Sequence, residues 1–494
     1  MLHKLRHLLV LIIVALLPFH ALLVTYGTEL IYGPGHSPVL FLALWKEALI
    51  TVILLIIFFE LFFVEKKKLA QIIKGGAKWK FSLDKVTWCA LGIILLSLVT
   101  ELWTDVPDMQ WAYGFKYTVF PLIVFLMCRK VSWEEDFLDK KIIPVLMFVS
   151  GVIALYGIVS FFLPQSFFSA LGYSDAHSIY APGSSLSAFQ QISGTSIRRI
   201  QSTFAGPNQL AIWLLIPWSI SLVIFLKTIR NKKSEALPTT HPSSLRFAEA
   251  SYPLPTSLIL SIFTLTIIGA ALVLAFSRSA WIAAFVITII AICIQLKGRT
   301  KVITLSSIVG FVIASVLVIY LSAPELIDRS ISNKHHFERT RDGVIEMFKN
   351  PLGHGLGTAG PASNRFSDAC MHFDKGADIS WASDRNDLCL FVEGEQVQPS
   401  DRACTCPVLP ENWYVQVGYE LGIVGFMMFV ALVVFVIKRG QAPLMKSKIC
   451  CNNIILAFLG VSIAALFLHA FEDSAVAYTL WILVGISLSA LCKK

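Results

Sequence analysis

Residues 196–226 read SIRRIQSTFAGPNQLAIWLLIPWSISLVIFL, in which two arginines and a Pro-Asn pair precede a long apolar run. An α-helix of about 20 apolar residues can cross about 30 Å of hydrocarbon, and this run is long enough to do so. Similar runs recur along the whole chain of 494 residues, of which 56% are hydrophobic and 15% charged. The mean hydropathy is +0.70. This composition excludes an ordinary soluble protein and predicts one that lies in lipid.

The spacing of the apolar runs predicts an all-α, polytopic membrane protein with about twelve transmembrane helices. They begin roughly at residues 8, 38, 86, 113, 142, 207, 257, 279, 302, 412, 453 and 475. A β-barrel would show short alternating segments instead of runs such as LLVLIIVALL. The basic leader MLHKLRH is typical of a signal peptide, but no small-residue cleavage site follows its apolar core, so we interpret it as the start of a helix.

The predicted helices divide the chain into three segments. Residues 1–321 hold the first nine helices, residues 322–410 form one long extracytoplasmic loop, and residues 411–494 hold the last three helices. A second insertion, residues 234–257, is rich in Pro and Ser and is predicted to be a flexible linker.

Lysine and arginine crowd alternate loops, including VEKKKLAQIIKGGAKWKFSLDK, KTIRNKK and KRGQAPLMKSK. This positive-inside bias places both termini in the cytoplasm, in a multi-pass protein of the cytoplasmic membrane, with the long loop and the arginines of residues 196–226 on the outer face. The net charge of +9 is therefore explained by topology and not by a nucleic-acid partner.

Four of the ten cysteines, Cys370, Cys389, Cys404 and Cys406, lie in the long outer loop. In an oxidising compartment such a cluster predicts two disulfides. Three pairings are possible, and a Cys404–Cys406 bridge is the least favourable because it closes a strained ring. A metal site formed by these thiols with His372 is the alternative, although the spacing matches no zinc pattern.

Two further segments of the long loop have recognisable patterns. FERTRDGVIEMFKN, residues 337–350, predicts an amphipathic helix on the membrane or on the protein surface. PLGHGLGTAG, residues 351–360, is similar to a phosphate-binding loop, but no Lys-Ser/Thr follows it and no strand precedes it. We interpret it as a tight non-helical crossing.

Ionisable residues gather at the predicted outer ends of the helices: Glu101, Arg198, Arg199, Arg278, Glu411, His469, Glu472 and Asp473. Lys46, Glu47 and Lys116 are deeper, and Lys46 and Glu47 are predicted to form an ion pair. A charge at the centre of a span costs about 3 kcal/mol, so such a cluster indicates a function or mutual pairing.

Two interpretations of these charges follow. The arginines could pair with Glu101, Glu411 and Asp473 to hold the helices together. Alternatively, two guanidinium groups could bind a lipid diphosphate, because arginine suits bidentate phosphate contact. Neutralising the diphosphate would stabilise it as a leaving group, and a base would then be needed for an incoming hydroxyl.

Four segments together resemble the O-antigen ligase and polymerase superfamily of membrane glycosyltransferases. They are RIQSTFAGPNQLA from Arg199, LAFSRSAWIA around Arg278, RTRDGVIEMFKNPLGHGLGT, and ENWYVQVGYELGIVGF from Glu411. They occur in the family's order, with its helix count and its long loop before the last block, and the resemblance covers most of the chain from Ile200 onward.

The resemblance implies an inverting, metal-independent transfer, without a cofactor, of a glycan from undecaprenyl diphosphate to a glycan, lipid or protein acceptor. Arg199 and Arg278 match the arginines that hold the diphosphate, and Arg198 could replace Arg199. The family's ligases place a histidine, proposed as the base, where this chain has Glu411. Glu411 is therefore expected to act as the base or to orient the acceptor hydroxyl, with Asn412 and Tyr414 as contacts. Asn208, Glu101 and Asp473 are possible supporting residues.

The resemblance leaves the activity open among ligation to a lipid acceptor, polymerisation of repeat units and transfer to protein hydroxyls. Two further classes compete with it. A secondary transporter also has twelve helices, but it binds substrate near the bilayer midplane, whereas the charges here gather on one face. A scaffold without chemistry would keep its outer arginines paired.

Overall fold

The computed structural model describes residues 2–33, 36, 38–73, 83–174, 186–192, 195, 197–235, 256–322, 330–373, 375–376, 378–380, 385, 388–441 and 449–491. Most of the linker predicted at residues 234–257 lies outside these ranges. The described chain is mostly helical, as predicted.

The helices of the first half are α1 (Leu2–Leu16), α2 (His20–Tyr32), α3 (Leu40–Ala43), α4 (Trp45–Ile73), α5 (Lys85–Val99), α6 (Asp108–Gly114), α7 (Phe120–Lys130), α8 (Ile143–Ser160), α9 (Gln165–Ser169) and α10 (Pro207–Glu235). Short 3-10 turns, η1 (Leu17–Phe19) and η2 (Thr100–Leu102), and π-helical turns, η3 (Phe115–Val119) and η4 (Leu138–Ile142), extend some of them. Strands β1 (Gln190–Gln191) and β2 (Arg198–Arg199) precede α10.

The second half contains α11 (Thr256–Leu274), α12 (Arg278–Gln295), α13 (Gly298–Ser322), α14 (Ser330–Lys349), α15 (Gly360–Phe366), α16 (Trp413–Gln441), α17 (Ile449–Ala464) and α18 (Ser474–Leu491). Strands β3 (Ala369–Phe373), β4 (Leu388–Val392) and β5 (Glu395–Gln398) lie between α15 and α16. A helix occurs at each of the twelve predicted starts, although the first begins at Leu2, inside the predicted basic leader.

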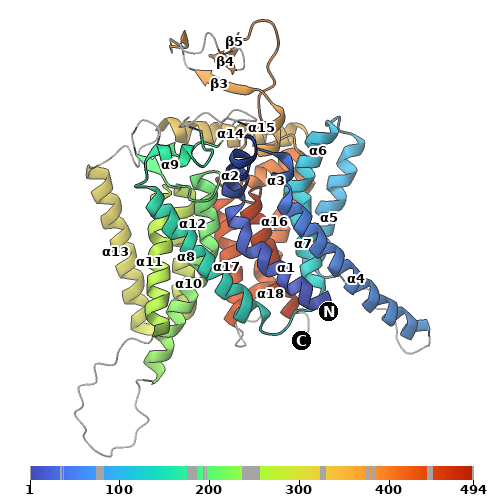
Figure 1. The fold of residues 1–494 in the computed structure, drawn as a ribbon, viewed down its shortest axis with the longest axis vertical. Helices are drawn as coiled ribbons and strands as arrows, with labels where there is room; N and C mark the ends of the chain where they lie inside the picture. Colours follow the sequence, from blue (N-terminus) through green and yellow to red (C-terminus); the bar gives the residue numbers. More distant parts are fainter. Residues whose placement is uncertain are drawn as a thin grey trace, which may run out of the picture.

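The long helices form one bundle, with α10, α12, α16, α17 and α18 at its centre (Figure 1). α14 and α15 lie across one end of the bundle, and the small sheet β3–β5 projects beyond them. We call this end the sheet end. The first helix begins and α18 finishes at the opposite end, so the two ends of the described chain lie on the same side of the bundle.

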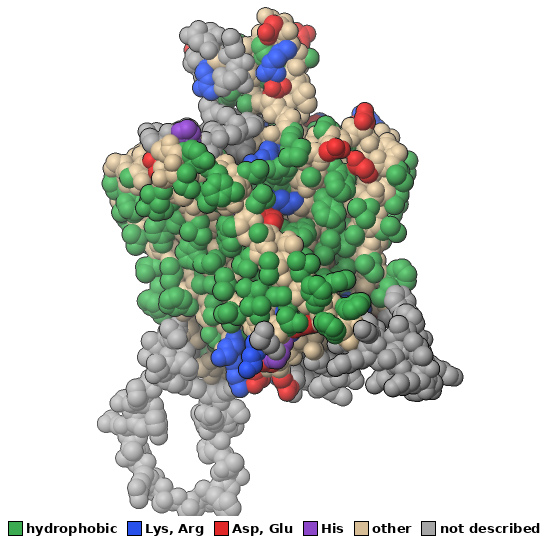
Figure 2. Space-filling view, turned by 45° about the vertical axis from the view of Figure 1, so that its right-hand side comes forward, with side chains coloured by type: hydrophobic (Ala, Val, Ile, Leu, Met, Phe, Trp, Pro, Cys, Tyr) green, Lys and Arg blue, Asp and Glu red, His purple; other side chains and the backbone are tan. Residues whose placement is uncertain are grey.

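The bundle has the surface of a membrane protein. Among the described residues, eight helices are long and apolar enough to cross a membrane, and three shorter apolar helices, Ser261–Leu274, Asn453–Ala464 and Ser474–Ser489, accompany them. Figure 2 shows a broad band of hydrophobic side chains across one face of the bundle, with most charged side chains above and below it and a few within its upper part. The prediction of a helical membrane protein is therefore confirmed, while the count of twelve spans stays a prediction.

The bundle's core surrounds α10. Its side chains from Leu210 to Ile216 are buried almost completely, and Trp213 is among the largest fully buried side chains. Pro207 begins α10 because the first helical position needs no backbone N–H donor. The outer face of α13, in contrast, is unburied along its described length, as expected of a helix that contacts lipid.

The four cysteines of the long loop form two disulfides, Cys370–Cys406 and Cys389–Cys404. This confirms the predicted disulfides and removes these thiols from the alternative metal site. His372 stacks on Phe391 of the neighbouring strand. β3 pairs in parallel with β4, and β4 pairs antiparallel with β5. The sequence analysis did not predict this sheet.

We expect the double variant Cys370→Ser, Cys406→Ser to destabilise the sheet by about 3 to 4 kcal/mol, because a bridge over many residues restricts the unfolded chain. The Cys370–Cys406 disulfide joins residues with a sequence separation of 36, whereas the Cys389–Cys404 disulfide joins residues with a separation of 15. Removal of the Cys389–Cys404 disulfide should therefore destabilise the protein less. Hydrogen exchange of the amides of β4 measures the effect. Cys293→Ser, at a free exposed cysteine in α12, is the control, and equal exchange in all variants would contradict the prediction.

Candidate functional site

The hairpin before α10 directs Arg198 and Arg199 apart. In β2, Arg198 pairs with Gln191 and Arg199 with Gln190 of β1. Because neighbouring strand residues point to opposite faces, the two side chains diverge. The Arg198 guanidinium lies 4.6 Å from the centre of the Phe189 ring and donates to the carbonyl of Leu163. Arg198 thus binds the segment after α8, which leaves Arg199 as the arginine facing α10.

Arg199 connects the start of α10 to the turn between α11 and α12. Its Nε donates to the carbonyl of Ala275 at 3.0 Å, and its Nη2 donates to Asn208 Oδ1 at 2.7 Å. Asn208 is the second residue of α10, so two predicted site residues are in direct contact. These contacts hold the guanidinium at the first turn of α10.

Arg278 is the first residue of α12 and follows Ala275 in the same turn. Phe276, with φ 48°, bends the chain there. The Arg278 side chain is half-buried and, within the described part of the chain, has no hydrogen bond or ion pair. At the opposite end of the bundle, by contrast, Arg129 is bound by Asp84 and Thr87.

The turn therefore carries concentrated positive charge. Two guanidinium groups lie beside the N-termini of α10 and α12, whose exposed N–H groups also favour anions. Among the described residues, the contacts named here for these arginines do not include Glu101, Glu411 or Asp473, and the interpretation that the charges only hold helices together stays open. The guanidinium and backbone N–H groups of this region can donate hydrogen bonds to phosphate oxygens.

Glu411 lies in the loop before α16 and contacts α14. Its carboxylate forms ion pairs with His336 and Arg339, and Thr340 Oγ1 donates to the carbonyl of Pro410 at 2.8 Å. Within the described ranges, Glu411 pairs with neither Arg199 nor Arg278. The structure thus places the predicted base in contact with the surface helix and gives it no direct bond to the predicted diphosphate site.

Asn412 and Tyr414 are both held by hydrogen bonds within the protein. Asn412 Oδ1 accepts from the backbone N–H groups of Tyr414 and Val415 and caps α16, while its Nδ2 donates to the carbonyl of Leu466. The Tyr414 hydroxyl donates to the carbonyl of Ser462 at 2.9 Å. A role for either residue as an acceptor contact stays a prediction.

Asp473 and Glu101, the two carboxylates predicted to support the site, lie in different elements. Asp473 Oδ1 accepts from the N–H of Val476 at 3.0 Å and caps α18, and burial raises the pKa of its carboxyl. Glu101 lies in η2, and its Oε2 has no hydrogen-bond partner in the described part of the structure. Neither contacts the arginines.

The sequence analysis did not identify Glu420 as a candidate site residue, although Glu420 lies in the motif ENWYVQVGYELGIVGF. Glu420 is buried in α16, and its Oε1 accepts from the N–H groups of Gly357 at 2.9 Å and Ala359 at 3.4 Å. A carboxylate in the middle of an apolar helix is a signal that could have identified it. The glycine-rich segment 351–360 is thus a crossing over α16, as predicted, and its N–H groups bind a carboxylate of the protein.

A second missed group joins three elements. His469 Nδ1 bonds to Gln416 Oε1, Gln416 Nε2 donates to Glu472 Oε2 at 2.9 Å, and Glu472 Oε1 accepts from the N–H of Ala362 at 3.0 Å. We call His469, Gln416 and Glu472 the His469 chain. Burial raises the pKa of the Glu472 carboxyl well above its usual range, and the nearby Glu420 adds to this.

The deeper charges form their own cluster. Glu47 pairs with Lys46 at 3.2 Å, which confirms the predicted pair, and with Lys116 of η3 at 3.0 Å. Lys46 Nζ also lies 2.9 Å from His20 Nε2. These residues bind one another across α2, α4 and η3.

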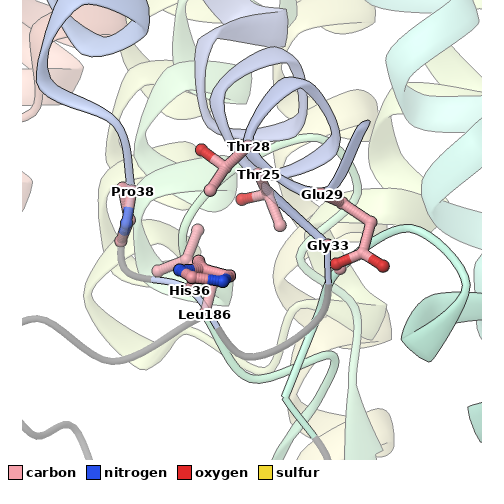
Figure 3. A pocket seen from close by; sticks show the side chains of 8 residues that line it. Thr25, Thr28, Glu29, Gly33, His36, Pro38 and Leu186 are labelled. Carbon is pink, nitrogen blue, oxygen red and sulfur yellow. The ribbon is translucent and has the colours of Figure 1, made fainter. Parts of the chain in front are cut away.

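Figure 3 shows a small pocket between the end of α2 and the chain after α9. Thr25, Thr28, Glu29 and His36 give it a polar wall. The residues that line it include no predicted site residue, so it is separate from the arginines.

A scan against models of known protein families and a search of curated proteins find no match for this chain. The resemblance to the O-antigen ligase and polymerase superfamily therefore rests on the four motifs and stays a prediction.

Proposed function

We propose that this protein is a membrane glycosyltransferase that moves a glycan from an undecaprenyl-diphosphate carrier to an acceptor hydroxyl. The observation that supports it best is Arg278, a half-buried guanidinium without a partner among the described residues, in the turn that Arg199 contacts. A buried cation without a counter-ion is costly, so the site favours an anionic ligand. A lipid diphosphate has the required charge and reaches the site from within the membrane.

The proposal includes a topology. All twelve predicted helices cross the cytoplasmic membrane, both termini are cytoplasmic, and the sheet end faces outward. The termini lie opposite the sheet end, and an outward sheet end puts both disulfides in an oxidising compartment.

The chemistry follows from the charges. The Arg199 and Arg278 guanidinium groups bind the diphosphate and stabilise the negative charge that develops on it as the bond to the sugar breaks. The acceptor hydroxyl attacks the anomeric carbon from the opposite face, which inverts its configuration. Asn208 keeps Arg199 oriented through the bond to its Nη2. The resemblance assigns the base to Glu411.

The test is a transfer assay with the full chain in lipid nanodiscs, supplied with undecaprenyl-diphosphate-linked glycan. We expect free undecaprenyl diphosphate and a transferred glycan. A ladder of longer lipid-linked chains from donor alone indicates a polymerase, product that requires a lipid acceptor indicates a ligase, and product on an added protein indicates an O-oligosaccharyltransferase. Absence of transfer with every acceptor class, together with absence of donor binding, would refute the proposal.

A secondary transporter is the second candidate, because Lys46, Glu47, Lys116 and His20 form a cluster of ionisable groups between α2, α4 and η3. Intramembrane ionisable groups are typical of substrate and proton pathways. Flux of lipid-free glycan or of protons into proteoliposomes, without transfer, would favour this function.

A further inference from the structure

His469 lies in the loop between α17 and α18, at the sheet end, and its ring is held by hydrogen bonds from inside the protein. Gln416 Nε2 donates to Glu472, so the Gln416 carbonyl oxygen faces His469 and must accept a proton from Nδ1. The proton of the neutral ring is thus on Nδ1, and Nε2 carries a lone pair.

Nε2 is buried and has no hydrogen-bond partner among the described residues. Burial, together with the positive charges of Arg339 and His336, lowers the pKa of His469 to about 4. The ring is therefore neutral at pH 7, and Nε2 is able to accept a proton.

The groups that face His469 come from every element packed around it. α14 provides Arg339 and His336, which pair with Glu411 in the loop before α16. α16 provides Gln416, and the loop before α18 provides Glu472, whose carboxyl is also affected by the buried Glu420 of α16. α14 runs across the sheet end of the bundle (Figure 1), and the charges of its Arg339 and His336 act on the histidine.

We propose that His469 is the general base of the glycan transfer and that Glu411 holds α14 over it. This inference rests on the proposed function and differs from the resemblance, which assigns the base to Glu411. Glu411 is bound to Arg339 and His336, whereas His469 has an unused lone pair and a hydrogen-bonded orientation, the features of a general base.

The step balances as follows. The acceptor oxygen forms a bond to the anomeric carbon, and its proton passes to His469 Nε2. The bond between that carbon and the diphosphate oxygen breaks, and the diphosphate leaves with the electron pair. The resulting imidazolium keeps its hydrogen bond from Nδ1 to the Gln416 carbonyl oxygen. Nε2 is buried, so access of the acceptor requires the elements around His469 to move apart.

The first test compares His469→Asn with wild type in nanodiscs. Asparagine can still donate to Gln416 but cannot accept the proton, so we expect kcat to fall at least about 100-fold. Binding of undecaprenyl diphosphate should stay within about threefold, because the arginines are intact. If wild type transfers glycan and His469→Asn keeps a third or more of its kcat, the inference is wrong while the proposed function stands.

Glu411→Gln separates the two candidate bases. If Glu411 only holds α14, its variant should change KM more than kcat, with kcat within about tenfold of wild type. If kcat falls at least about 100-fold in Glu411→Gln but not in His469→Asn, the base is Glu411. Failure of wild type to transfer glycan or to bind donor would instead refute the proposed function.

The pH profile provides a readout that a structural role would not change. The rate should fall as pH drops through about 4, where His469 becomes protonated. Arg339→Gln removes a positive charge near the ring, which raises the pKa of His469 and should move this acidic limb to higher pH. An acidic limb that stays at the same pH in Arg339→Gln would overturn the assignment. This test remains decisive if His469→Asn fails to fold.

Discussion

Replacing Arg278 by alanine is expected to reduce glycan transfer at least about 100-fold, because a charge-assisted contact to a developing anion contributes about 3 kcal/mol in a site shielded from water. The measurement is kcat/KM for transfer, together with binding of undecaprenyl diphosphate. Arg278 is the most informative of the arginines, since it has no bond to other described residues whose loss would disturb the fold. Folding of Arg278→Ala should therefore match wild type.

Two variants define what Arg278 provides. Arg278→Lys keeps the charge but loses the planar pair of donors, so its activity should lie between those of alanine and wild type. Arg299→Ala, at an exposed arginine at the start of α13 near the opposite end of the bundle, is the control and should transfer normally. Equal activity of Arg278→Ala and Arg299→Ala would exclude a diphosphate contact.

A double-variant comparison tests whether the two arginines act on one ligand. Arg199→Ala also removes the bonds to Ala275 and Asn208, so its own effect mixes binding with structure. If both guanidinium groups bind the same diphosphate, the effect of Arg278→Ala should become smaller once Arg199 is absent. Additive effects would indicate separate ligands.

The helices were predictable because each depends on local composition. A run such as that after Pro207 is apolar over its whole length, and no alternative fold satisfies its backbone in lipid. The start of α10 at Pro207 and of α12 at Arg278 likewise follow from local signals, a proline at the first helical turn and a short polar turn.

The His469 chain was not predictable, because its members come from two separate elements. His469 and Glu472 belong to one hairpin that the sequence identified only as charged, and Gln416 is an inconspicuous residue in an apolar helix. Only the packing of α16 against the hairpin places the amide between the imidazole and the carboxylate. The contact of Glu411 with α14 likewise depends on tertiary structure and not on the motif around Glu411.

The second large effect is expected at Gly353, where the glycine-rich segment meets a break in α16. α16 departs from helical geometry at Gly422, with φ 70° and ψ −174°. There the N–H of Gly355 donates to the carbonyl of Glu420 at 2.9 Å, and the N–H of Ile423 donates to the carbonyl of Pro351 at 3.1 Å. The two backbones are thus in direct contact, which leaves no room for a side chain.

Gly353→Ala should destabilise the protein by several kcal/mol. Gly353 has φ +82°, and an added Cβ would lie 2.4 Å from the Glu420 carbonyl oxygen and 2.5 Å from the Gly422 nitrogen. The left-handed conformation alone costs alanine about 1 kcal/mol. The remainder arises because the opposing atoms are backbone and cannot turn aside as a side chain could. Thermal unfolding in detergent and hydrogen exchange of the Gly355 and Ile423 amides measure the loss.

Gly376→Ala separates the two causes, because Gly376 has the same φ of +82° but nothing within 4 Å of an added Cβ. Gly298→Ala repeats this control within the bundle, with φ +58° and open space around it. Both should lose only about 1 kcal/mol or less, the cost of the conformation. A Gly353→Ala variant no less stable than these two would show that the segment can move away from α16, and Glu420 would then not depend on the N–H groups of Gly357 and Ala359.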